Sequence, residues 1–300
     1  MSRTYKAIGI NLKAMPLGEA DRIVTILTKE FGLLRAVAMG ARKQNSKLGG
    51  RSGLFVVNEL MMAKGRSLDK ITQAETVESY PGLARNLKKL TAGQYLAEIV
   101  LNQALSEQPQ EELFYLLGEH LGRIEQCTDS EVLPRLVHAV FQLLVVAGIA
   151  PQVHQCCITG AIVEPNFANA DPQAGFSGTI GGVVKLEEFD RMLEEQSPRL
   201  RVQSSVGEYR VAASTAIASS DPQRVANSTR TYASRSLNVP LDAAELAALQ
   251  HLPQTDPPAP DQHPLAVWLT LEKLLRQYAQ YHFDQPIRSA VLIDTCFAPD

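Results

Sequence analysis

Five short apolar segments follow one another in the first 80 residues, and turn-forming or basic residues separate them. In the stretch KAIGINL the side chains of Ile8, Ile10 and Leu12 alternate with others, which is the two-residue period of a half-buried strand. Five strands in so short a span predict a small β-barrel. The expected strands are YKAIGINL (5–12), RIVTILT (22–28), GLLRAVAM (32–39), LFVVNELMM (54–62) and KITQAETV (70–77).

The link between the third and fourth of these strands is strongly basic. The stretch MGARKQNSKLGGR (39–51) carries four Lys and Arg residues and no acid. Residues 1–90 hold 16 Lys and Arg against 7 Asp and Glu, whereas the remaining residues hold 13 against 25. A five-stranded barrel with a basic surface is typical of the oligonucleotide-binding (OB-fold) architecture, and a mobile basic loop suits phosphate oxygens. The alternative is a solvated loop with no ligand.

After Pro81 the apolar period becomes helical. We expect helices within 82–105 and 111–124, a third from Thr128 to about Gly148, and a last one over 264–283. Thr128 and Glu131 have the spacing of a capping box at the start of the third helix. These helices predict a bundle whose apolar stripes are core, and Trp268 is expected to be a packing anchor. The stripes are Leu83, Leu87, Leu90, Tyr95 and Ile99, then Leu113, Leu117 and Leu121, then Leu265, Trp268, Leu271, Leu275 and Tyr278.

The chain is therefore interpreted as an α+β protein of several domains. The expected parts are a barrel over 1–81, a helical bundle over 82–150, an irregular lobe over 151–201, a flexible or inserted segment over 202–263, and a C-terminal helix over 264–300 that packs on the helical domain. The N-terminus lacks the pattern of a signal peptide, and no apolar run is long enough for a membrane span, so we expect a cytoplasmic protein without a membrane partner.

The sequence carries none of the common motifs of nucleotide binding, zinc proteases or serine hydrolases, and we expect no enzymatic activity. Glu19 and Asp21 could share a divalent cation in a metal-dependent nuclease, but two ligands rarely suffice, and turn residues are the favoured interpretation. The four cysteines, Cys127, Cys156, Cys157 and Cys296, are expected to be free thiols.

Three stretches together resemble the RecO family of bacterial recombinational repair proteins. They are PLGEADRIVTILTKEFGLLRAVAMGARKQNSKLGG, QAETVESYPGLARNLKKLTAGQYLAEI and ELFYLLGEHL, and FDQPIRSAVLID resembles the closing segment of the family. The resemblance implies an OB-fold barrel, a helical domain, binding of single- and double-stranded DNA, and annealing of complementary strands without ATP. It also implies two direct protein partners, RecR and the C-terminal tail of single-stranded-DNA-binding protein. RecA is an indirect partner, which the protein helps to load on single-stranded DNA. We expect the tail to dock on the helical part.

The lobe departs from the family pattern, in which two C-x-x-C pairs bind zinc. Cys156 stands at the first ligand position, but Thr159, Lys185 and Glu188 stand at the other three. We therefore expect no metal and no other cofactor, and the lobe is expected to be held by apolar packing. The residues expected in that packing are Phe167, Phe176, Ile180 and Val184.

DNA contacts are expected from cations on the barrel and on the first helix. Aromatic residues are scarce on the barrel, since only Tyr5, Phe31 and Phe55 are candidates and Phe55 is expected in the core. Binding should therefore be dominated by phosphates and tolerate any sequence. An OB-fold adaptor for structured RNA is the main alternative. The expected DNA-binding residues are Arg35, Arg42, Lys43, Lys47, Arg51, Arg85, Lys88 and Lys89.

Overall fold

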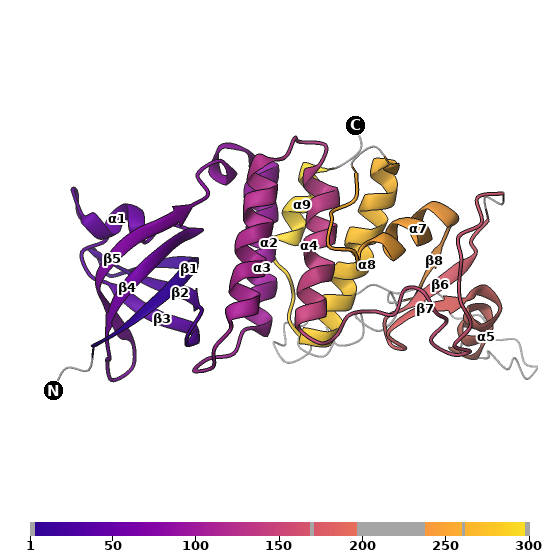
Figure 1. Cartoon of the computed structure of the whole chain (residues 1–300), viewed down its shortest axis with the longest axis horizontal. Coiled ribbons are helices and arrows are strands. Elements are labelled where there is room, and N and C mark those ends of the chain that lie inside the picture. The colour runs from indigo at the N-terminus through magenta and orange to yellow at the C-terminus, as the bar shows by residue number, and fades with distance from the viewer. Residues whose placement is uncertain (1–3, 169–170, 197–237, 260–261, 298–300) are drawn as a thin grey trace, which may run out of the picture. The chain divides into compact units, whose positions relative to one another are not determined.

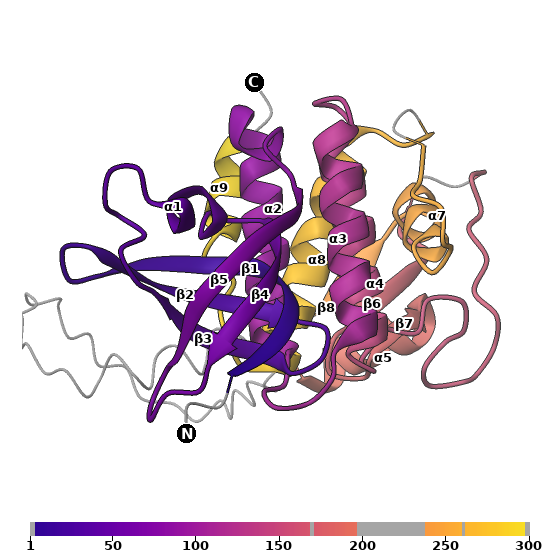
Figure 2. The same ribbon diagram turned by 60° about the vertical axis from the view of Figure 1, so that its left-hand side comes forward.

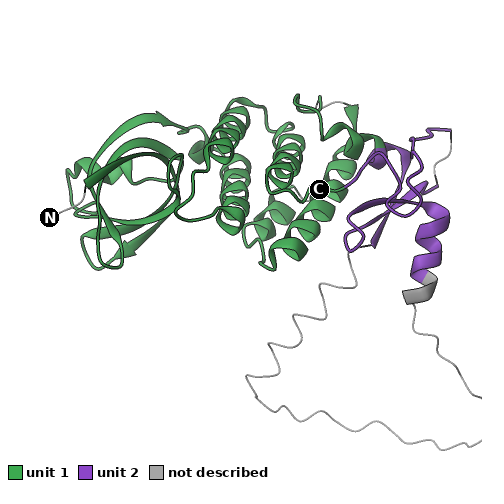
Figure 3. Ribbon diagram, turned by 60° about the horizontal axis from the view of Figure 1, so that its bottom comes forward, with its two compact units in different colours: residues 1–151, 247–300 green, residues 152–246 purple. Residues whose placement is uncertain are grey.

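A computed structural model describes residues 4–168, 171–196, 238–259 and 262–297. The chain divides into two units, which Figure 3 shows in different colours. One unit comprises Met1–Pro151 together with Ala247–Asp300, and the other comprises Gln152–Leu246. The barrel and most of the helices thus belong to the same unit.

The N-terminal strands form a closed barrel in the order β1-β2-β3-β5-β4 (Figures 1 and 2). Neighbours are antiparallel except β3 and β5, which pair in parallel over Ala36–Ala38 and Asp69–Ile71 and so close the barrel. This is the predicted OB-fold. The elements are β1 (Thr4–Leu17), β2 (Asp21–Thr28), β3 (Gly32–Ala38), α1 (Lys47–Arg51), β4 (Val56–Ala63) and β5 (Asp69–Ser79).

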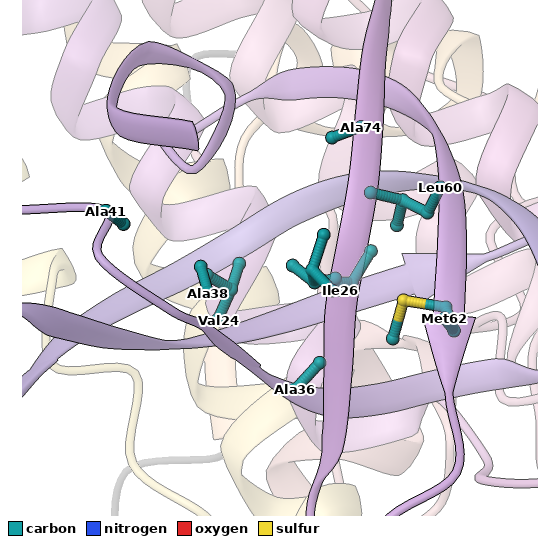
Figure 4. Packing of buried hydrophobic residues seen from close by; sticks show 9 residues of the cluster. Val24, Ile26, Ala36, Ala38, Ala41, Leu60, Met62 and Ala74 are labelled. Atoms are coloured by element: carbon teal, nitrogen blue, oxygen red, sulfur yellow. The ribbon is translucent and has the colours of Figure 1, made fainter. Parts of the chain in front are cut away.

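The barrel core combines small and large side chains (Figure 4). Ala36 and Ala38 of β3 lie in one cluster with Ile26, Leu60 and Met62, and all five are at most 1% exposed. Small residues beside larger ones allow the strands to approach and fill the interior without voids. The small alanine side chains of β3 therefore help the barrel to close over a filled core.

The predicted alternation fails in the middle of β1. Asn11 is buried together with its neighbours Ile10 and Leu12, whereas Ile8 is only half-buried. The register of β1 against β2 shifts between Asn11 and Lys13, and such a bulge changes which face each side chain occupies. A polar residue thus enters the interior, where its amide has a structural role described below.

The helices of the first unit confirm most of the predicted stripes, since Leu113, Leu117, Leu121 and Trp268 are each at most 3% exposed. Two members were predicted wrongly, because Leu87 is 64% and Leu265 is 45% exposed. Each is the first residue of its helix, and side chains there point back beyond the packed turns. The elements are η1 (Leu83–Arg85), α2 (Leu87–Gln103), α3 (Glu111–Gln126), α4 (Val132–Val146), α8 (Leu265–Phe283) and α9 (Ala290–Cys296).

The capping box is only half formed. The carboxylate of Glu131 accepts hydrogen bonds from the Thr128 backbone N–H at 2.7 Å and from the Thr128 hydroxyl at 2.8 Å. These bonds and the Arg135 guanidinium lower the pKa of Glu131 to about 2. The Thr128 hydroxyl is therefore a donor here instead of a cap, and α4 begins only after Glu131.

The second unit contains a three-stranded sheet in the order β7-β6-β8, with β6 (Ala174–Ser177), β7 (Gly182–Lys185) and β8 (Asn238–Leu241). Helices α5 (Leu186–Gln196) and α7 (Ala243–His251) follow β7 and β8. Residues 202–237 of the predicted flexible segment lie outside the described part. Its described residues 238–259 contain β8, which pairs with β6, and so belong to the fold.

The predicted packing of the lobe is correct for two of four residues. Phe176 and Val184 are buried, but Phe167 is 70% and Ile180 is 39% exposed. Ile180 lies in the tight turn between β6 and β7, where its side chain has no sheet to cover it. Phe189 of α5 fills the interior instead, and its ring lies against Gly175, where a side chain would collide with it.

The barrel is joined to the helices by backbone hydrogen bonds. The Leu33 N–H donates to the Leu105 carbonyl at 2.9 Å, and the Gln110 N–H donates to the Lys29 carbonyl at 2.9 Å. Gly32 has a φ of 62° in the β2–β3 turn, and a Cβ there would collide with the carbonyl oxygens of Leu105 and Gln108. This turn therefore requires glycine both for its backbone angle and for the close approach.

We expect Gly32→Ala to lower the free energy of unfolding by clearly more than Gly18→Ala. Both glycines have positive φ, so both variants carry backbone strain of about 1 kcal/mol. Only at Gly32 does the added methyl meet backbone, since nothing lies within 4 Å of a Cβ at Gly18. Urea unfolding of the two variants and the parent measures the difference. Equal losses would contradict the close approach.

Candidate nucleic-acid interface

The basic stretch 39–51 is held to the β1–β2 turn by three hydrogen bonds. The Gly40 N–H donates to Asp21 Oδ1 at 2.7 Å, and the Arg42 N–H donates to the Ala20 carbonyl at 2.8 Å. The Arg42 guanidinium donates to the Gly18 carbonyl at 2.7 Å. Asp21, the first residue of β2, is thus a structural acceptor that joins the two turns.

A second set of bonds fixes the end of this stretch, which forms the short helix α1. The buried Asn11 amide donates to the carbonyls of Arg51 at 2.7 Å and Gly53 at 2.9 Å. The Asn58 amide, which is fully buried, donates to the same Arg51 carbonyl at 2.9 Å. Arg22 donates to the Gly49 carbonyl and to Ser52 Oγ, each at 3.1 Å. The sequence suggested a mobile loop, but these bonds tie α1 and the following residues to the barrel.

The predicted barrel cations are presented at the surface with one exception. Arg35, Arg42, Lys43 and Lys47 are exposed, whereas Arg51 is half-buried. Within the described part of the chain, Arg35, Lys43, Lys47 and Arg51 have no side-chain ion pair or hydrogen bond. Their charges are therefore available for a ligand, while that of Arg42 is shared with the Gly18 carbonyl.

The predicted cations near the first helix are less available. Arg85 is exposed in η1, but the Lys88 ammonium lies 5.1 Å from the centre of the Phe297 ring. Lys89 Nζ donates to the Glu125 carbonyl at 2.8 Å. Lys88 and Lys89 are thus engaged within the helical part, and Arg85 is the member of this group that is free to contact a ligand.

The outer face of β1, β2, β3 and β5 carries two cross-strand rows, in which Arg35 was an expected DNA-binding residue and Lys13 and Lys70 were not. One row is Lys13, Thr25 and Arg35, and the other is Met15, Ile23, Val37 and Lys70. Cross-strand partners project to the same side of a sheet, and the neighbours Val24, Ile26, Ala36 and Ala38 point into the core. Lys13, Arg35 and Lys70 are exposed and have no side-chain partner among the described residues.

These rows give the outer face a chemistry that suits single-stranded nucleic acid. Lys13 and Arg35 lie in the row next to the aliphatic side chains of Met15, Ile23 and Val37, and Lys70 ends the aliphatic row. Met15 is 36% exposed. Cations can neutralise phosphates, while aliphatic side chains cover the faces of sugars and bases. Tyr5 and Phe31 pack edge to face with ring centres 5.0 Å apart, and Phe55 is buried as predicted. The fold and this face define an oligonucleotide-binding barrel attached to a helical domain.

Comparison with known proteins gives the family. Residues 1–80 match the description "Recombination protein O N terminal", and residues 84–187 match "Recombination protein O C terminal". DNA repair protein RecO of Nostoc sp. strain PCC 7120 is 52% identical over 305 residues, which cover 99% of this chain and 98% of that protein. DNA repair protein RecO of Gloeobacter violaceus is 41% identical over 299 residues, which cover 99% and 95%. The chain belongs to the RecO family of DNA repair proteins.

Of the four positions that correspond to zinc ligands, one carries a cysteine, and the side chains of Cys156 and Glu188 make other contacts. Cys156 Sγ accepts a hydrogen bond from the Lys185 backbone N–H at 3.3 Å, while Glu188 pairs with Arg191 at 2.7 Å. Burial alone would raise the pKa of the Cys156 thiol, but hydrogen bonds from Thr159 and from the Lys185 N–H outweigh it and the net shift is downward. Across the residues that the structure describes, no three His, Cys, Asp or Glu side chains are placed to hold a metal ion.

None of the described helices is long and apolar enough to cross a membrane.

We expect the purified protein to contain well under one equivalent of zinc, because three of the four ligand positions lack a thiolate. Elemental analysis after extensive dialysis measures the content. The unfolding midpoint should not change when a strong chelator is added, because a single cysteine at the four positions is too few ligands for a structural zinc ion. About one equivalent of zinc would show that other side chains supply the missing ligands.

The basic stretch and the outer face can be compared by their salt dependence. Alanine at Arg42, Lys43, Lys47 and Arg51 should make the slope of log K against log salt for single-stranded DNA shallower by about 3, at about 0.7 per phosphate contact. Alanine at Lys13, Arg35 and Lys70 should make it shallower by about 2. Lys185→Ala with Lys273→Ala is the control, because both residues are exposed and neither belongs to the barrel. A loop variant that retains its affinity and slope would exclude the stretch as a DNA-facing element.

Proposed function

We propose that this chain is a recombination mediator that binds single- and double-stranded DNA on its barrel and anneals complementary strands without ATP. The observation that carries the proposal is the outer barrel face, where Lys13, Arg35 and Lys70 lie next to aliphatic side chains and lack partners within the described residues. Membership of the RecO family supports the assignment to DNA repair.

The chemistry of annealing requires no covalent step. Two strands repel each other through their phosphates, and cations that neutralise part of this charge lower the barrier to pairing. If the protein face contacts the DNA backbone, the base edges of the bound strand stay exposed. A second strand can then pair with them where its sequence is complementary. Contacts of this kind position DNA without reading its sequence. The protein therefore acts as a binding surface and needs no energy from ATP.

The proposed mediator role also requires protein partners. In this proposal RecR joins the chain, the C-terminal tail of single-stranded-DNA-binding protein docks on the helical part, and RecA is then loaded on the strand. The charge distribution supports separate surfaces for DNA and for protein partners, because the basic residues concentrate in 1–90 and the acidic residues in the remainder. DNA and protein partners would thus contact different parts of the chain.

We expect the full chain to anneal complementary strands coated with single-stranded-DNA-binding protein at the same rate with and without ATP. Quenching of paired fluorophores on the two strands follows the reaction, and the Lys13, Arg35 and Lys70 alanine variant should be slower. An RNA adaptor would be blocked by the coat and would not anneal. Cleavage of the DNA in magnesium would instead support the nuclease alternative.

A further inference from the structure

A groove of about 640 Å³ lies beside the barrel, between β1, helix α2 and the segment that follows α8. Leu12 and Lys13 contribute from β1, and Leu54 contributes from the link before β4. Helix α2 contributes Ala97 and Leu101, and the C-terminal segment contributes residues 285, 286, 288 and 289. All of these residues belong to the first unit, and a groove of this size can accept a ligand as large as a nucleotide.

Two cations stand at the walls of the groove. Lys13 of β1 and Arg288 of the C-terminal segment are exposed, and neither side chain pairs with another residue that the structure describes. The one carboxylate in the lining, Glu98, accepts hydrogen bonds from the Ser289 N–H and hydroxyl, each at 3.0 Å. These neutral donors satisfy part of its hydrogen bonding but leave its charge, so the lining carries two unpaired cations and one carboxylate.

The remaining lining combines apolar surface with side-chain amides. Leu12 and Ala97 are buried beneath it, and Leu54 is 38% exposed. Gln94, Asn102 and Gln285 bring three amides, none of which bonds to another described side chain or backbone group. Amides can donate to and accept from base edges, apolar side chains cover base faces, and cations bind phosphates. An acidic peptide could use the same amides through its backbone, so the choice of DNA rests on the continuity of the groove with the outer face of the barrel.

The groove is continuous with the outer face of the barrel, because Lys13 belongs to both. We propose that single-stranded DNA bound on the outer face continues past Lys13 into this groove, where Arg288 binds a phosphate and a base lies against Leu54 and Leu101. The proposal rests on the DNA binding proposed above and extends it to a segment near the C-terminus. It makes the helical part a continuation of the barrel's binding surface.

The test compares short oligonucleotides, which cover only the barrel face, with longer ones on the full chain. Arg288→Ala should weaken binding of the long oligonucleotide and make its salt slope shallower by about 0.7, with no effect on the short one. Gln94→Ala with Asn102→Ala should weaken binding of the long one about threefold to tenfold at an unchanged slope, since neutral hydrogen bonds are lost. Lys273→Ala, an exposed cation on α8, is the matched control.

The possible outcomes separate this proposal from the one on which it rests. If the parent chain binds both oligonucleotides and Arg288→Ala binds them equally well, the DNA does not enter the groove and the inference is overturned. If Arg288→Ala weakens only the tail peptide of single-stranded-DNA-binding protein, the groove is a peptide site and the inference is also overturned. If the parent binds neither oligonucleotide, the proposed function itself fails.

Discussion

Closure of the barrel through the parallel pairing of β3 with β5 is the contact on which the proposed interface depends. Only three residue pairs make this contact, from Ala36 with Asp69 to Ala38 with Ile71. The small side chains of Ala36 and Ala38 let the strands meet over a filled core. Closure also brings Lys70 into one row with Val37, Ile23 and Met15, so this third cation joins the aliphatic side chains only in the closed barrel.

Buried amides connect this core to the basic stretch. Asn11 and Asn58 are at most 1% exposed, and both donate to the Arg51 carbonyl. Thr76 in turn donates to Asn58 Oδ1 at 3.1 Å. Buried polar groups destabilise a fold unless they are hydrogen-bonded, so these side chains specify one position for the α1 backbone. These buried amides thus fix the position of α1 and, with it, of its two cations, Lys47 and Arg51.

The net charge of residues 1–90 overstates what the barrel can offer to DNA. Arg22 is directed to the Gly49 carbonyl and Ser52, and Lys89 to the Glu125 carbonyl. Lys29 lies 3.2 Å from a Glu111 oxygen and donates to the Tyr115 hydroxyl. Cations that are already paired have less free energy to gain from a phosphate. Affinity for DNA should therefore follow the unpaired cations, and the total charge is a poor guide to it.

Periods of two and 3.6 residues are local signals, so the five strands, the helices and most of their buried stripes could be predicted from the amino-acid sequence. It also indicated a basic N-terminal part and the missing zinc ligands. It could not show the bulge that buries Asn11 or the exposure of Leu87, Leu265, Phe167 and Ile180, because these depend on register and on where packing ends. The tertiary structure was needed to place Lys13, Arg35 and Lys70 on one face of the barrel, and Arg288 in the same groove as Lys13. Contacts between residues so distant along the chain follow from barrel closure and helix packing, which no local pattern encodes.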